Sequence, residues 1–162
     1  ESKYPVIVRS YGLGMDTGGP GRHRGGLNIV KEYEITSSGV HLSLWFERTR
    51  TPQWGLFGGY DGAIPRVVLE PGTGQERKIL KSNMLPVAQR ARFRTHTGGG
   101  GGYGPPWQRN PEKVQQDVID GYVSREQAEK VYKVCFTDDS LTLDRASTAA
   151  ARAGMTGERT ER

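Results

Sequence analysis

The chain has 162 residues, the length of about one domain, but only 34% of them are apolar and 23 are glycine. No apolar run approaches the roughly 20 residues of a membrane helix, and no charged-then-apolar leader is visible. We therefore expect neither a membrane span nor a signal peptide. The single cysteine, Cys135, excludes an internal disulfide framework; it predicts a small buried side chain and a protein of the reducing cytoplasm.

The first two thirds of the chain predict β-strands. Segments 26–36 and 39–49 alternate apolar and polar residues with period two, with Tyr33 and Ile35 on one face of the first and Glu32 and Glu34 on the other. Further strands are expected in residues 4–11, 65–72, 76–80 and 91–97. Turn residues predict two hairpins, one through residues 37–39 and one through residues 72–75.

After residue 109 the pattern becomes helical. Asn110 followed by Pro111 predicts a capped helix that ends at Gly121. Ser124 and Gln127 have the spacing of a capping box for a second helix. An alanine-rich helix within residues 138–154 should end at Gly154, followed by a polar tail.

These elements predict an α+β, β-rich fold: an antiparallel sandwich or barrel-like sheet followed by short C-terminal helices. The expected organisation is a β-rich body (1–97), a Gly/Pro loop (98–109), a helical segment (110–154) and a polar tail (155–162).

The loop "GGGGGYGPPW" admits several interpretations. As a phosphate cradle it lacks the Gly-Lys-Ser/Thr that leads directly into a helix. As an RNA-binding segment it interleaves arginine, glycine and aromatic residues, which could stack on bases. As a rigid structural loop it would use glycine for positive φ and close backbone approach, with its ends anchored by burial of Tyr103 and Trp107. The rigid loop is favoured, with interface residues Gly98, Gly99, Gly100, Gly101, Gly102, Tyr103, Gly104 and Trp107.

Basic residues cluster in two places. Residues 86–110 contain four arginines and no acid, and a second glycine-rich segment, 12–26, holds a histidine between two arginines. The candidate anion contacts are Arg22, His23, Arg24, Arg92, Arg94 and His96. The three histidines lack metal-ligand spacing, and no catalytic triad or carboxylate pair is evident. We therefore predict no metal site and no catalytic residue in this chain.

Three long motifs resemble the C-terminal part of the hydantoinase B/oxoprolinase family: "YPVIVRSYGLGMDTGGPGRHRGGLNIVKEYEI", "PQWGLFGGYDGAIP" and "THTGGGGGYGPPWQRNPEKVQQDVIDGYVSREQAEKVYKV". The likeness covers residues 1–134 and continues more loosely to about residue 153. The glycine loop followed by Tyr-Gly-Pro-Pro is its most diagnostic part.

The resemblance implies a component of an ATP-dependent multisubunit enzyme. Such proteins hydrolyse cyclic amides such as hydantoins or 5-oxoproline, or carboxylate ketones as acetone and acetophenone carboxylases do. The expected partners are a hydantoinase A-like subunit, with ATP and a divalent metal, and the remaining hydantoinase B-like N-terminal chain. Since family proteins are several times longer, we expect a structural and interface role and no catalysis by this chain alone. The alternative is a small nucleic-acid-binding module.

Overall fold

A computed structural model describes residues 3–137 and 140–155 of the chain. The described residues form two compact units with interleaved segments. The sheet unit comprises residues 3–14, 28–51 and 64–98, and the glycine-rich unit comprises residues 15–27, 52–63, 99–137 and 140–155. Two internal segments of the expected β-rich body, residues 15–27 and 52–63, therefore belong to the unit that contains the helices. Among the described residues, no helix is long and apolar enough to cross a bilayer.

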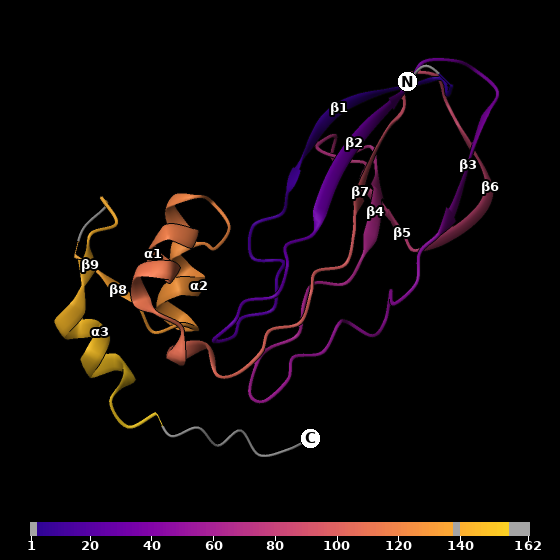
Figure 1. The fold of residues 1–162 in the computed structure, drawn as a ribbon. Helices are drawn as coiled ribbons and strands as arrows, with labels where there is room; N and C mark the ends of the chain where they lie inside the picture. Colours follow the sequence, from indigo (N-terminus) through magenta and orange to yellow (C-terminus); the bar gives the residue numbers. More distant parts are fainter. Residues whose placement is uncertain (1–2, 138–139, 156–162) are drawn as a thin grey trace. The chain divides into compact units, whose positions relative to one another are not determined.

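The sheet unit is built from seven strands in two sheets (Figure 1). The strands are β1 (Val6–Leu13), β2 (Ile29–Ile35), β3 (Val40–Trp45), β4 (Arg66–Leu69), β5 (Arg77–Ile79), β6 (Lys81–Val87) and β7 (Arg92–His96). Five of them form an antiparallel sheet in the order β1-β2-β7-β4-β5, and β3 pairs with β6. Since β1 and β5 are the two edges of the larger sheet, that sheet is not closed into a barrel.

One apolar core joins the two sheets. Its fully buried members are Ile35, Leu44, Val67 and Phe93, and Tyr33 and Phe93 stack with ring centroids 4.9 Å apart. The period-two prediction for β2 and β3 is confirmed, because the residues expected to face inward are in this core. The opposite face of β2 carries Glu32 and Glu34.

Strand pairing differs from the sequence prediction in one place. The hairpin through residues 72–75 is confirmed, since β4 and β5 pair directly across it. The hairpin through residues 37–39 is wrong: Gly39 does turn, with φ of 73°, but β3 pairs with β6, a strand that the sequence pattern missed. The reason is non-local: β2 already lies between β1 and β7, so neither of its edges is available to β3.

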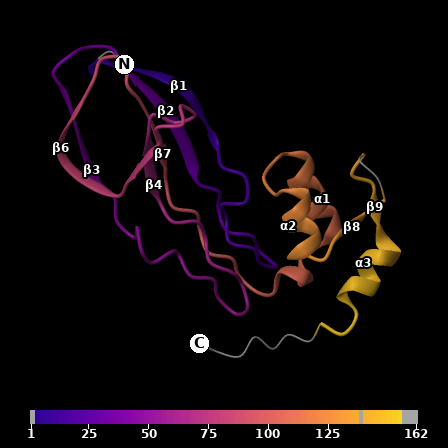
Figure 2. The ribbon, with the colours of Figure 1, turned by 180° about the vertical axis from the view of Figure 1, so that it is seen from behind.

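The glycine-rich unit contains the helices α1 (Pro111–Ile119), α2 (Arg125–Lys130) and α3 (Arg145–Arg152), a 3-10 turn (Pro106–Gln108) and the short strands β8 (Cys135–Phe136) and β9 (Leu143–Asp144) (Figure 2). A second core, built on Val114, Val123, Ala128 and Tyr132, packs α1 against α2.

The helix caps are largely those that the sequence predicts. The side chains of Asn110 and Ser124 accept hydrogen bonds from the backbone N–H groups of Lys113 and Gln127, at 3.1 and 3.0 Å. The reciprocal half of the capping box is replaced, because the Ser124 N–H donates to Asp16 Oδ1 at 2.8 Å. Helix α3 starts later than expected, with Asp144 as its cap, and Gly154 follows its end with φ of 83°.

Candidate functional site

Three extended segments of the glycine-rich unit, residues 15–27, 52–63 and 99–104, are cross-linked by backbone hydrogen bonds; we call them the glycine junction. Gly19 donates to the Gly100 carbonyl at 2.8 Å, and Gly102 donates to the Tyr60 carbonyl at 2.9 Å. Tyr60 in turn donates to the Pro20 carbonyl at 2.7 Å. Because each segment bonds to the other two, the glycine loop is a fixed part of this unit and not a free linker.

Close backbone approach explains the glycines of the junction. A Cβ atom on Gly25 or Gly101 would overlap the carbonyl oxygen of Gly100 or Trp54, respectively. Within the loop 98–104, Gly104 alone has a positive φ, 71°. The expectation of several left-handed glycines is therefore wrong, whereas close approach, the other reason that the sequence suggests, accounts for the run. Collagen requires glycine at its crowded axis for the same steric reason.

One of the two aromatic residues of the loop is placed differently from the prediction. Tyr103 is 49% exposed and so does not anchor the loop by burial. Its backbone N–H and carbonyl pair with those of His23, at 2.9 Å each. The Tyr103 ring lies against Phe57, with centroids 5.1 Å apart, and Phe57 is 75% exposed at a positive φ of 49°. Trp107 is partly buried in the 3-10 turn after the loop.

The predicted cations of segment 12–26 lie in two environments. Arg22 and His23 are exposed beside the loop. Arg24 instead points inward and donates hydrogen bonds to the Asp117 carboxylate of α1 through Nε and Nη2, both at 3.3 Å. Its guanidinium also lies 5.6 Å from the centroid of the Tyr122 ring. Since Arg24 already has a carboxylate partner, its charge is largely committed within the unit.

Asp117 is the centre of a buried charge cluster that includes a second arginine. Arg109 Nη2 donates to Asp117 Oδ2 at 2.8 Å, and all three charged side chains are at most 16% exposed. Tyr132 lies beside this charge cluster. Burial raises the pKa of its hydroxyl to about 12, and the nearby charges of Arg109 and Arg24 lower the same pKa by smaller amounts. Two arginines for one aspartate leave an excess positive charge, so this cluster depends strongly on Asp117.

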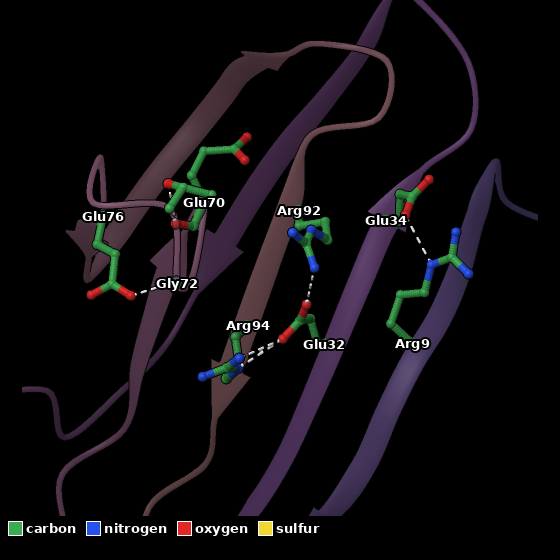
Figure 3. Close-up of polar contacts among 9 residues, drawn as sticks. Arg9, Glu32, Glu34, Glu70, Gly72, Glu76, Arg92 and Arg94 are labelled. Atoms are coloured by element: carbon green, nitrogen blue, oxygen red, sulfur yellow. Dashed lines mark hydrogen bonds and ion pairs between the residues drawn. The ribbon is translucent and has the colours of Figure 1, made fainter.

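The remaining predicted cations lie on the outer face of the sheet unit, the face opposite its core. Glu32 of β2 is only 6% exposed and lies between two arginines of β7 (Figure 3). Arg92 Nη1 donates to it at 3.3 Å, and Arg94 donates through Nε and Nη2 at 2.9 and 2.6 Å. One row further, Arg9 of the bulged strand β1 donates to Glu34 at 2.8 Å (Figure 3). This charge pair lowers the pKa of the Glu34 carboxyl.

His96 is on the same outer face, next to a residue that sequence reasoning missed. Cross-strand pairing sets His96 of β7 directly opposite Arg66 of β4. Burial, together with Arg66 and Arg94, lowers the pKa of the His96 imidazole, which is therefore mostly neutral at pH 7.

Several charged residues that contribute to these sites were not among the predicted ones, including Glu32, Asp117 and Arg66. Asp117 had a usable signal, because it falls on the same helical stripe as Val114 and Val118. Arg66 had none, since its proximity to His96 depends on which strands pair. Within the described ranges, no three His, Cys, Asp or Glu side chains gather in a way that could hold a metal ion.

The sequence model of the hydantoinase B/oxoprolinase family matches residues 1–106. The chain belongs to this family. It is 31% identical to the B-type subunit of a putative D-/L-hydantoinase from Pseudomonas sp. (strain NS671) over 140 residues, 85% of this chain and 24% of that protein. It is also 31% identical to the beta subunit of the caprolactamase from Pseudomonas jessenii over 157 residues, 94% of this chain and 27% of that protein.

A solved structure shares the fold of this hydantoinase B-like domain. The nucleotide-free structure of acetone carboxylase, from work on ATP-dependent acetone carboxylation, superimposes with a TM-score of 0.72 at 20% sequence identity. The match covers 92% of this chain and 24% of that one. The chain thus spans about a quarter of the length of the relatives that it matches.

Proposed function

We propose that this chain acts as the C-terminal hydantoinase B-like portion of an ATP-dependent multisubunit enzyme. The enzyme hydrolyses a cyclic amide or carboxylates a ketone, and this chain supplies structure and interfaces and not the reacting groups. The family membership carries the proposal, together with 31% identity across 94% of the chain to a caprolactamase subunit. The structure of an ATP-dependent acetone carboxylase with the same fold supports the dependence on ATP.

The partners that we propose are the remaining hydantoinase B-like polypeptide and a hydantoinase A-like subunit that binds ATP and a divalent metal, in a cytoplasmic complex. We also propose that the sheet unit is a two-layer sandwich, which its shared core supports. A relative about four times as long offers ample polypeptide to cover exposed apolar surface on this domain.

The glycine junction presents the surface that we assign to this contact. Its exposed apolar side chains include Trp54, Leu56, Phe57 and Tyr103, which are 57%, 49%, 75% and 49% exposed. Aromatic side chains on a rigid backbone are typical of the centre of an interface. Phe57 combines a positive φ, which costs backbone strain, with an exposed apolar ring, and an interface role would account for both. The occupant that we propose is the remaining hydantoinase B-like polypeptide.

Co-expression tests this proposal. The tagged chain is produced with the remaining hydantoinase B-like polypeptide and the hydantoinase A-like subunit encoded beside it. We expect stoichiometric co-purification and ATP hydrolysis that depends on an added cyclic amide or ketone. A Phe57→Ser, Tyr103→Ser double variant should lose the hydantoinase B-like partner. The control Ile119→Ser alters another exposed apolar residue, on α1, and should retain the partner. Recovery of the chain as a lone monomer would contradict the proposal.

A nucleic-acid-binding module receives less support. Arg24 and Arg94, one in each arginine-rich stretch, already bind carboxylates, which removes much of the charge that phosphate contacts would need. Steeply salt-dependent binding of RNA or DNA in a gel-shift titration would favour this alternative.

A further inference from the structure

Arg66 is a partly buried cation that has no counter-charge among the described residues. It lies at the start of β4, and its guanidinium makes no hydrogen bond or ion pair with any residue that the structure describes. Every other arginine on the outer face of the sheet that is discussed above has a carboxylate: Arg9 pairs with Glu34, and Arg92 and Arg94 share Glu32. A cation that is partly shielded from water and has no counter-charge beside it is suited to bind an anionic ligand.

The neighbours of Arg66 supply further donors. His96 is opposite Arg66 across the β4–β7 ladder, and Arg94 follows two residues away on the same face of β7. Glu32 fixes Arg94 through Nε and Nη2, which leaves Nη1 without a partner among the described residues. The charged or titratable groups on this part of the face are thus Arg66, Arg94, His96, Glu32 and, beyond Val68, Lys78.

We propose that Arg66, Arg94 and His96 form a binding site for an oxyanion on the outer face of the sheet. Two planar guanidinium groups, each with several N–H donors, and one imidazole N–H could together donate hydrogen bonds to the oxygens of a carboxylate, bicarbonate or phosphate group. Glu32 acts as a positioning residue, because it fixes Arg94 while neutralising only part of the local charge. The anion comes either from solution or from a carboxylate side chain of a partner protein, and the experiment below separates the two sources.

The site differs from another basic region of the same unit. A hollow of about 470 Å³ is lined by Arg48, Thr49, Arg50, Thr51, Leu80 and Lys81. All three of its cations are exposed and already hydrated, so an anion there gains little. Arg66 is partly buried, so an anion beside it is screened less than an anion beside a fully exposed cation.

The test is an NMR titration of the full 162-residue chain at pH 7 and constant ionic strength. The His96 ring signal, assigned with a His96→Gln variant, is followed while sodium phosphate or sodium acetate replaces sodium chloride. We expect a saturable shift of this signal with at least one of the two anions and a rise of the His96 pKa at saturation. Saturation by phosphate indicates a solution oxyanion; saturation by acetate alone indicates a carboxylate side chain.

Variants show whether Arg66 is responsible. Arg66→Gln should weaken the affinity for the anion by about tenfold or more. Arg66→Lys keeps the positive charge but loses the paired N–H donors of the guanidinium, so it should weaken the affinity by less. Arg77→Gln is the matched control: it removes the same charge from β5 on the opposite face and should leave the affinity unchanged. The proposal does not depend on any partner subunit. It is overturned if neither anion gives a saturable His96 shift, or if Arg66→Gln, with a folded amide spectrum, binds as the parent does.

Discussion

The α-carbon of Gly101 faces the carbonyl group of Trp54 so closely that a Cβ atom would lie 2.6 Å from the carbonyl carbon and overlap the oxygen. These two residues belong to different segments of the glycine junction. Their contact explains why part of the five-glycine run needs glycine without needing positive φ. It also distinguishes glycines that are required from glycines that are not.

Gly101→Val should destabilise the glycine-rich unit by about 1–3 kcal/mol or more, because the backbone segments must separate to admit a side chain. Gly26→Ala is the control: no atom of the described residues lies within 4 Å of its Cβ position, so its effect should stay within about 0.5 kcal/mol. Urea unfolding followed by tryptophan fluorescence measures both. Equal midpoints for the two variants would mean that the junction is not close-packed.

Asp117→Asn should cost about 3–5 kcal/mol of unfolding free energy, because Arg24 and Arg109 would lose their shared counter-charge while remaining buried. The control Glu126→Gln breaks a pair with Lys130 whose side chains are both 73% exposed, and should leave the stability nearly unchanged because water screens this pair. Denaturant titrations at pH 7 give both values. A loss for Asp117→Asn no larger than for Glu126→Gln would show that the cluster is well hydrated.

We predict that the folded chain loses stability at alkaline pH because Tyr132 ionises. Its pKa in the folded chain is about 12, above the ordinary value of 10.0, because burial disfavours the phenolate. The unfolded chain therefore releases this proton first, so the stabilisation is complete below pH 10 and is lost as the pH rises from 10 through 12. The loss should reach about 2–3 kcal/mol.

Urea unfolding at pH 9, 10 and 11 measures this loss, with Tyr132→Phe as the control that cannot ionise. The parent should lose more stability across this range than Tyr132→Phe does. Parallel curves for the two proteins would contradict the prediction.

The folded-state pKa of His96 should lie below 6.5, because burial, Arg66 and Arg94 all disfavour the imidazolium. The stability contributed by neutral His96 is complete above pH 6.5 and is lost as the pH falls through the folded-state pKa. NMR titration of the ring protons without added phosphate or acetate measures that pKa, and Arg66→Gln should raise it.

Local chemistry, readable from the sequence, determined the elements themselves. The caps of α1 and α2 follow from Asn110 and Ser124, and the inward faces of β2 and β3 follow from alternation. Such features depend on residues within a few positions of one another. The family resemblance could likewise be recognised from contiguous motifs.

Only the tertiary structure decided which distant segments meet. It paired β3 with β6 instead of β2, joined Arg24 to Asp117 across 93 positions, and set Arg66 opposite His96. It also showed that most glycines of the loop are required by close backbone approach and not by positive φ. The physical reason is the same in each case: these contacts depend on how whole strands and segments share limited edges and space, which no local pattern encodes.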